Sequence, residues 1–241
     1  MFGLGLFEKS AGYYDAIYDA VGKDYGREAK RLREIIRKRQ KSTGKTLLDV
    51  ACGTGRHISF LKQFFTVEGL DLDRSLLAIA RKRNPGIRFH YGNMLNFNLK
   101  KQFDVITCLF SAIGYMRSYQ RLQQAIRNME RHLKQGGVLI VEPWLTPAAF
   151  HPGRISAVFV NQAKMKIVRM NRTVVKGRIS KLDFHYMVGT PDNISYFKEE
   201  DEFGLFTNDK YMKAFRSVGL RVVRDSKGLI GRGLYIGTKP L

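Results

Sequence analysis

Residues 46–55 read TLLDVACGTG, an apolar run that leads directly into a turn containing two glycines. The apolar part predicts a buried strand, and the residues from Arg56 onward predict a helix. Gly53 and Gly55 allow positive φ and a close approach of the backbone to a ligand. The first N–H groups of the following helix point toward the same place. This order predicts a nucleotide bound at the top of a parallel sheet.

The same turn departs from the fingerprint of dinucleotide-binding proteins. That pattern, G-x-G-x-x-G, uses a third glycine to pack helix and strand closely, but position 58 is Ile58. Asp49 lies four residues before the first glycine, Gly53, and Asp71 lies eighteen residues after it at the end of the next apolar run. A carboxylate offers two acceptors to the vicinal hydroxyls of a ribose. The pattern therefore favours adenosylmethionine over a dinucleotide.

Composition limits the classes of protein to consider. The chain has 241 residues, 44% of them hydrophobic, which suits one large α/β domain or one domain with an insertion. Its 42 Lys and Arg against 21 Asp and Glu give a formal net charge of +21. Such an excess attracts nucleic acid, anionic membrane or phosphorylated small molecules, and it also suits a basic surface with no polyanion partner.

The cysteines and the apolar runs indicate the compartment. Cys52 and Cys108 are the only cysteines, with no CxxC pair and no Cys/His cluster. We therefore expect no metal site and a reducing, cytoplasmic environment. No run approaches the roughly 18 apolar residues that span a bilayer, so no membrane partner is expected.

Strand and helix patterns alternate after the turn. Strands are expected at residues 46–50, 67–71, 87–91, 103–109 and 138–141, and helices at residues 27–41, 75–83 and 120–134. Five strands that alternate with helices predict an α/β fold with a doubly wound, Rossmann-like sheet. Its ligand belongs at the carboxyl ends of the strands.

The pattern changes after the fifth strand. Residues 155–203 alternate without a helical period, which predicts an inserted antiparallel sheet that acts as a substrate cover or a dimer surface. Beyond it we expect a helix at 207–218, a strand at 221–223 and an edge strand at 231–237. The whole chain reads as one domain. Its parts are an N-terminal lid or helical segment (1–44), a cofactor-binding core (45–142), the inserted sheet (143–204) and the completion of the core sheet (205–241).

Two further features bear on the ligand. Residues 13–19 are rich in tyrosine and predict either an amphipathic helix packed on the core or a lid whose tyrosines meet a ligand. Nine residues on the turn and at the strand ends are candidate cofactor contacts, with Leu72 expected to pack on adenine and a polar side chain after the third strand to bind its amino group. The candidates are Asp49, Ala51, Gly53, Gly55, Asp71, Leu72, Asn93, Met94 and Leu109.

At this level of detail the chain resembles a known family. The turn at 49–55 resembles motif I of class I adenosylmethionine-dependent methyltransferases. Other segments are similar to the bacterial nucleotide-linked aminosugar N,N-dimethyltransferases, which act on TDP-3-amino or TDP-4-amino deoxysugars. These segments are FSAIGY (110–115), EPW (142–144), GRGL (231–234), Tyr14-Asp15 and GKDY (22–25). The resemblance spans nearly the whole chain, is weakest in the inserted sheet, and implies a seven-stranded methyltransferase sheet with adenosylmethionine as cofactor.

The resemblance also implies roles for single residues. Asp71 would bind the cofactor ribose, and Asn93 stands where the family usually has an adenine-binding Asp. On the substrate side, Tyr14 would close over the methyl donor and the amine, Tyr115 would lie near the sugar amine, and Arg232 would grip the pyrophosphate. Ser111 belongs to the same substrate-binding set.

The expected chemistry is N-methylation of a small, phosphorylated amine. The sulfonium methyl is already activated, so the protein aligns the nucleophile and excludes water. An alkylammonium must lose a proton before attack. Candidate acceptors are Tyr14, Tyr115, Glu142 and His57, and the first three are the candidate catalytic residues. His57 has an alternative role as a helix-capping or core residue.

Three alternatives stay open. The charge fits an RNA or ribosomal-protein methyltransferase, although residues 109–112 read LFSA where base N-methyltransferases carry Asn/Asp-Pro-Pro-Tyr/Phe. Metal-dependent O-methylation needs acids at the end of the fourth strand, where this sequence has none. The chain would also suit a non-catalytic adenosylmethionine-binding protein that interacts through the inserted sheet. Nucleic acid and a homodimer formed by that sheet are thus both candidate partners.

Overall fold

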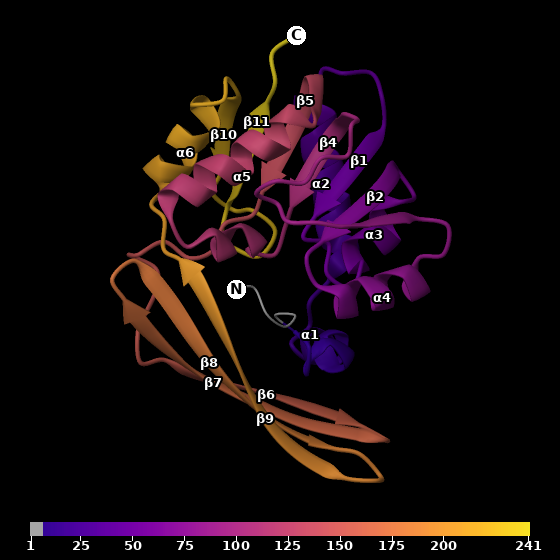
Figure 1. Ribbon diagram of the computed structural model, residues 1–241, viewed down its shortest axis with the longest axis vertical. Helices are drawn as coiled ribbons and strands as arrows, with labels where there is room; N and C mark the ends of the chain where they lie inside the picture. Colours follow the sequence, from indigo (N-terminus) through magenta and orange to yellow (C-terminus); the bar gives the residue numbers. More distant parts are fainter. Residues whose placement is uncertain (1–6) are drawn as a thin grey trace.

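The computed structural model describes residues 7–241 and places seven strands in one sheet (Figure 1). The strand order is β10-β11-β5-β4-β1-β2-β3. The strands are β1 (Thr46–Val50), β2 (Thr66–Asp71), β3 (Arg88–Tyr91), β4 (Phe103–Cys108), β5 (Leu133–Val141), β10 (Arg221–Asp225) and β11 (Leu234–Thr238). Strands β1 to β5 run parallel, and β11 runs antiparallel to both of its neighbours. This confirms the predicted Rossmann-like fold.

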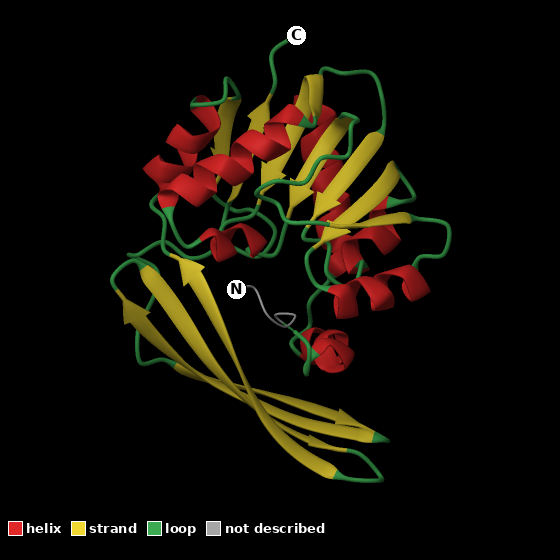
Figure 2. Cartoon of the chain, viewed as in Figure 1, coloured by secondary structure: helices red, strands yellow, loops and turns green. Residues whose placement is uncertain are grey.

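Helices cover both faces of this sheet (Figure 2). They are α2 (Tyr25–Arg39), α3 (Arg56–Leu61) and α4 (Arg74–Arg83) on one face, and α5 (Tyr119–Arg131) and α6 (Asn208–Arg216) on the other. The alternation of side chains along β1 explains the two layers. Leu47 is buried in one apolar cluster with Leu32 of α2, whereas the next residue, Leu48, is buried in a second cluster with Ile126 of α5.

A second sheet follows β5 in the sequence and lies apart from the first (Figure 1). It contains β6 (Ile155–Gln162), β7 (Met165–Lys176), β8 (Ile179–Gly189) and β9 (Ile194–Gly204), all antiparallel and in sequence order. This is the predicted inserted sheet. The 3-10 helix η1 (Ala11–Tyr13) and helix α1 (Tyr14–Ala20) lie between the two parts, and Ile17 of α1 is buried in the apolar cluster of the inserted sheet. A second 3-10 helix, η2 (Ala112–Met116), follows β4.

The C-terminal strand differs from the prediction. The expected edge strand at 231–237 is wrong, because β11 begins at Leu234 and lies inside the sheet, with β10 at the edge. Gly231 and Gly233 precede the strand and have φ values of +84° and +86°, which suit a loop. Both glycines belong to this loop, and Leu234 to Ile236 of the strand are buried, as expected inside a sheet.

Helix α5 ends earlier than the prediction of 120–134. It stops at Arg131, because the carbonyl of His132 accepts a hydrogen bond of 2.8 Å from the Phe103 N–H at the start of β4. Leu133 then pairs with Phe103, so β5 has already begun where we expected the last helical turn. None of the helices in residues 7–241 combines the length and the apolar character needed to cross a membrane.

Candidate active site

The turn between β1 and α3 contains three residues with positive φ: Ala51 at 58°, Gly53 at 55° and Gly55 at 71°. A Cβ at Gly55 would lie 2.9 Å from Nδ2 of Asn84 and 3.2 Å from Cβ of Ala80, so this glycine lets α4 pack closely on the turn. A Cβ at Gly53 would meet no described atom within 4 Å. The space above Gly53 is therefore open to a ligand, as the sequence predicts.

Asp71 lies beside this open turn at the end of β2. Its Oδ2 accepts a hydrogen bond of 2.7 Å from the Gly53 N–H, and its Oδ1 accepts one of 2.8 Å from the Asp73 N–H. Burial raises the pKa of Asp71 to about 6. Asp73, not Asp71, caps helix α4 by accepting from the N–H groups of Ser75 and Leu76. Asp71 thus stays at the end of β2, beside the open turn.

Asp49 is buried beneath the turn. Its Oδ1 accepts a hydrogen bond of 2.7 Å from the Thr107 hydroxyl of β4, and burial raises the pKa of its carboxyl group. Because this hydrogen bond joins β1 to β4 directly below the glycines, Asp49 supports the floor of the site.

The remaining candidate cofactor residues lie along the same edge of the sheet. Leu72 is 37% exposed, which leaves its side chain available to pack on a ring. The side-chain oxygen of Asn93 accepts a hydrogen bond of 3.0 Å from the Leu95 N–H and keeps a second lone pair that an amino group could use. Met94 and Leu109 are buried among the apolar core residues.

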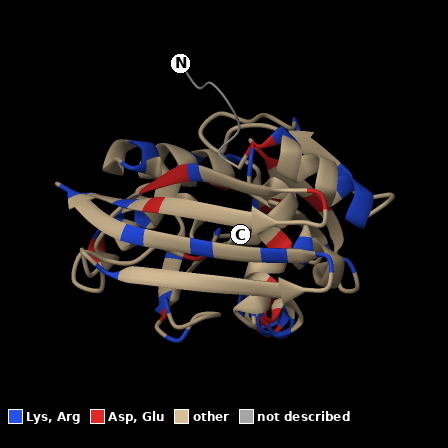
Figure 3. Cartoon of the chain, turned by 90° about the horizontal axis from the view of Figure 1, so that it is seen from below, with Lys and Arg blue, Asp and Glu red and all other residues tan. Residues whose placement is uncertain are grey.

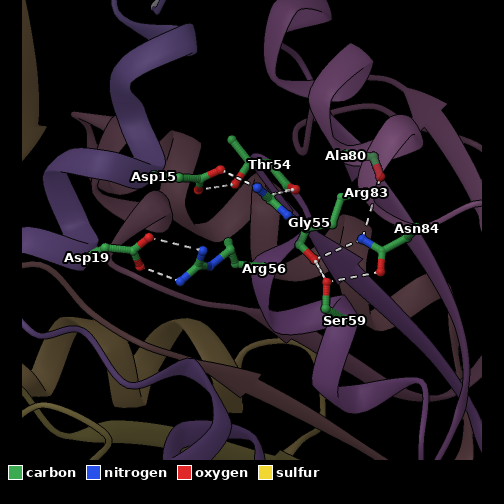
Figure 4. Close-up of polar contacts among 9 residues, drawn as sticks. All are labelled: Asp15, Asp19, Thr54, Gly55, Arg56, Ser59, Ala80, Arg83 and Asn84. Atoms are coloured by element: carbon green, nitrogen blue, oxygen red, sulfur yellow. Dashed lines mark hydrogen bonds and ion pairs between the residues drawn. The ribbon is translucent and has the colours of Figure 1, made fainter. Parts of the chain in front are cut away.

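Helix α1 is fixed over the glycine turn by polar contacts at two of its turns (Figure 4). Asp15 accepts a hydrogen bond of 2.7 Å from the Thr54 hydroxyl and forms an ion pair with Arg83 of α4. One turn further on, Asp19 forms an ion pair with Arg56, the first residue of α3. The helix therefore packs on the core beside the turn, as the first alternative for residues 13–19 predicts, and its role as a lid stays a prediction.

Tyr14 and Tyr115 face the space between the two sheets. The Tyr115 hydroxyl donates a hydrogen bond of 3.0 Å to Oδ1 of Asp201 in β9. Burial raises the pKa of both tyrosines well above the usual value, and for Tyr14 the nearby charges of Asp71 and Asp201 add to the effect. Both hydroxyls therefore stay protonated at neutral pH and act as hydrogen-bond donors.

Ser111, Glu142 and Arg232 come together at the ends of β4 and β5. Nη1 of Arg232 donates to the Ser111 hydroxyl over 2.7 Å, and its guanidinium lies 4.8 Å from the centre of the Trp144 ring. Glu142 is fully buried, and its Oε2 accepts a hydrogen bond of 2.7 Å from the Phe110 N–H. Its Oε1 is buried with no hydrogen-bond partner in the described part of the chain.

His57 belongs to a buried polar group that adjoins these residues, since Lys23 of this group lies 4.1 Å from the centre of the Phe110 ring. Its Nε2 lies 2.6 Å from Oε2 of Glu28, whose Oε1 accepts from Lys23 over 2.6 Å. Burial alone would raise the pKa of Glu28, but the hydrogen bonds and charges of His57 and Lys23 lower it. His57 is therefore a core residue, which was the alternative that the sequence left open.

Sequence reasoning missed two charged residues of the inserted sheet, Arg169 and Asp201. Both occupy inward positions, because residues two apart in a strand lie on the same face. Arg169 shares its face of β7 with buried Ile167, and Asp201 shares its face of β9 with buried Phe203. A charged residue on the apolar face of an alternating strand is the signal that would have identified them.

The sheet order, the glycine turn and the acid at the end of β2 together define a class I adenosylmethionine-dependent methyltransferase. A family model described as a methyltransferase domain matches residues 47–137. The residues present fit the cofactor, because the turn is open above Gly53 and the Asp71 carboxylate lies beside it.

Comparison with known proteins narrows the class to one family. A dTDP-3-amino-3,6-dideoxy-alpha-D-glucopyranose N,N-dimethyltransferase of Streptomyces fradiae is 39% identical over 94% of this chain and 89% of that protein. The crystal structure of Streptomyces venezuelae DesVI matches with a TM-score of 0.91 at 35% identity, over 97% of this chain and 99% of that one. CalS10, an amino pentose methyltransferase from Micromonospora echinaspora solved with bound adenosylmethionine, matches with a TM-score of 0.86 at 35% identity, over 94% and 96%. The chain belongs to this family of adenosylmethionine-dependent sugar N-methyltransferases.

Proposed function

We propose that this enzyme methylates the amino group of a nucleotide-linked deoxysugar. The observation that carries the proposal is the hydrogen bond of 3.0 Å between Tyr115 and Asp201, beside which Tyr14 lies close enough for the charges of Asp71 and Asp201 to raise its pKa. An amine held by these groups would lie next to the methyl donor. The names of the similar proteins, which are N,N-dimethyltransferases of dTDP-aminosugars, support this substrate class.

The chain's own residues orient the amine and keep water out. Adenosylmethionine supplies a methyl group that its sulfonium charge already activates. The hydroxyl oxygens of Tyr14 and Tyr115 can accept hydrogen bonds from the amine N–H groups, which leaves the amine lone pair free to point at that methyl. Behind Tyr115 the ring of Phe203 lies 4.6 Å away, and Trp144 stacks on Phe203 at 4.6 Å. These rings make a dry wall for the reaction.

The same row of rings leads toward a place for the nucleotide. Arg232 lies over Trp144 at the far end of the row. Arg169, on the inserted sheet, lies 5.4 Å from the centre of the Tyr18 ring of α1. Neither arginine forms an ion pair with a carboxylate within residues 7–241, and the Nε of Arg169 is buried without a hydrogen-bond partner there. A pyrophosphate would give both guanidinium groups the anionic acceptors that they lack.

Calorimetry tests both halves of this site. We expect adenosylhomocysteine to bind the wild-type enzyme, and Asp71→Ala to lose that binding. We expect TDP to bind the enzyme that already holds adenosylhomocysteine. Arg232→Ala and Arg169→Ala should each weaken the affinity for TDP by about tenfold or more, because each removes a charge-assisted contact. Arg221→Ala, on the exposed edge strand β10, makes the same change in net charge and should bind TDP normally. Equal weakening by all three arginine variants would show that only net charge matters and would refute the nucleotide site.

We also propose that the outer face of the inserted sheet binds a second copy of the chain. Phe159, Val168, Met187 and Tyr196 are paired in register and form an apolar row across all four strands. Phe159, Met187 and Tyr196 are 66%, 53% and 56% exposed, although an antiparallel sheet facing water usually presents polar side chains.

The charges around this row fit an identical partner. Figure 3 views the molecule from the side of the inserted sheet, whose strands carry both basic and acidic positions. The charged residues beside the row on this face include Arg172, Asp183, Lys198 and Glu200. Because both signs are present, a copy related by a two-fold axis would meet opposite charges despite the net charge of +21.

A further inference from the structure

The reaction proposed above needs a proton acceptor at the amine. An alkylammonium has no lone pair, so it must lose a proton before it can attack a methyl group. Tyr14 and Tyr115 are protonated, because burial raises the pKa of each well above the usual value. Glu142 is fully buried, so its Oε2 holds the Phe110 N–H and its Oε1, which has no partner within residues 7–241, is also shut off from solvent. None of these three residues suits the task.

Asp201 is a carboxylate placed in the same space. It lies at an inward position of β9, and its Oδ1 accepts the hydrogen bond from the Tyr115 hydroxyl at 3.0 Å. Its Oδ2 has no hydrogen-bond partner within residues 7–241, and no cation within that range forms an ion pair with it. One oxygen is therefore held in place by Tyr115 while the other is available to a ligand.

The surroundings of Asp201 tune its proton affinity. The pKa of Asp201 is raised to about 7, mainly by burial; the charge of Glu199 also raises it, while the Tyr115 hydrogen bond and the charge of Arg169 lower it. The titratable and charged groups that face it come from four elements besides its own strand. They are Tyr14 of α1, Tyr115 of η2, Arg169 of β7, Tyr186 of β8 and Glu199 of β9. A base poised near neutral pH can accept a proton in each turnover and release it again.

We propose that Asp201 is the catalytic base that takes the proton from the substrate ammonium, and that Tyr115 positions its carboxylate. The inference rests on the proposed function, since it needs an amine substrate. It assigns to the inserted sheet a part of the chemistry and not only the cover of the site.

The proton and electron balance is complete for each methyl transferred. The substrate ammonium gives one proton to the Asp201 carboxylate and becomes a neutral amine. Its lone pair forms the new C–N bond as the methyl–sulfur bond breaks, and that bonding pair stays on sulfur, which becomes a thioether. The product is again an ammonium, and Asp201 returns its proton to solvent before a second transfer.

The test is the pH dependence of kcat/KM for Asp201→Asn with an aminosugar nucleotide. For the wild type we expect activity to fall as the pH drops through about 7, because Asp201 becomes protonated. In the variant only substrate that is already neutral can react. The acidic limb of the profile, where kcat/KM falls, should therefore move up to the pKa of the substrate ammonium. The loss in kcat/KM should be about 100-fold at neutral pH and should shrink as the solution becomes more basic.

Two controls separate the possible outcomes. Glu202→Gln changes an adjacent residue, which pairs with Arg117, and it should keep the wild-type profile. Unchanged adenosylhomocysteine binding by Asp201→Asn shows that this variant is folded. A variant that is slower by the same factor at every pH, or one with the wild-type limb, would overturn the role of Asp201 and leave the proposed function intact. If the wild type methylates no aminosugar nucleotide, the proposed function itself fails.

Discussion

The protonation state of Asp71 should control the affinity of the enzyme for its cofactor. Burial raises its pKa to about 6 in the free protein, and the ionised form is the one that accepts two hydrogen bonds from a ribose. Affinity for adenosylhomocysteine should therefore be constant above this pKa and should fall by up to about tenfold per pH unit below it. Calorimetry between mildly acidic and mildly basic pH measures this. Asp71→Asn should bind weakly with no such dependence, and Asp201→Asn should keep it; a flat wild-type profile would contradict the assignment.

The two glycines of the turn should differ in their tolerance of a side chain. Gly55→Ala places a methyl group 2.9 Å from Asn84 and 3.2 Å from Ala80 at a φ of +71°, so both strain and contact oppose it. Gly53→Ala has strain at +55° but open space. In urea unfolding we expect Gly55→Ala to lose about 3 kcal/mol and Gly53→Ala about 1 kcal/mol. Equal losses would show that the close approach of α4 does not matter.

For single residues, the sequence predicts those contacts whose two partners lie close together in the chain. Asp73 and its helix cap are an example, since the donors lie two and three residues away. The contact between Tyr115 and Asp201 joins positions 86 residues apart, and that between Glu28 and His57 joins positions 29 apart. Such pairs depend on how separate elements pack. The inserted sheet brings Asp201 to Tyr115 only after it has folded back over the core.

Helix α1 offers the clearest prediction for a whole element. Its Asp15 is partly buried and contacts both Thr54 and Arg83, whereas its Asp19 is more exposed and pairs with Arg56 alone. Asp15→Asn should loosen the helix over the turn and raise KM for adenosylmethionine by about 5- to 20-fold, equivalent to a lost buried hydrogen bond with a charged group. Asp19→Asn should change it less than about threefold, as expected of a surface ion pair.

The same comparison shows whether the helix is a lid at all. Limited proteolysis near residue 20 should cut Asp15→Asn faster than wild type, and adenosylhomocysteine should protect the wild type. If Asp15→Asn and Asp19→Asn give the same KM and the same cleavage rate, α1 serves only as packing.

Elements were predictable where one rule decides them. The strands of the core follow from their apolar runs, and the inserted sheet follows from its alternation. The position of β11 did not follow, because an interior strand and an edge strand share one pattern and only the pairing with β5 distinguishes them. The end of α5 depends on the Phe103 N–H, which reaches His132 from a different strand.

For the whole molecule, the exposed apolar row predicts a dimer. Light scattering of the wild type should give the mass of two chains, and the double variant Phe159→Lys with Tyr196→Lys should give one, because four charges would be buried in the dimer. The control is Lys176→Ala, at the end of β7 and outside the apolar row, and this variant should stay dimeric. A wild type that is monomeric at every concentration would refute the interface.

The central claim is methyl transfer to the amine of a sugar nucleotide, and mass spectrometry of the products tests it most directly. Purified enzyme is incubated with adenosylmethionine and a panel of TDP-aminosugars, with a TDP-sugar that bears hydroxyl in place of the amine and with tRNA as controls. The account predicts that one or two methyl groups appear on the nitrogen of an aminosugar and that Asp71→Ala abolishes the product. Methylated tRNA, or a methylated hydroxyl sugar with the aminosugars unchanged, would contradict it.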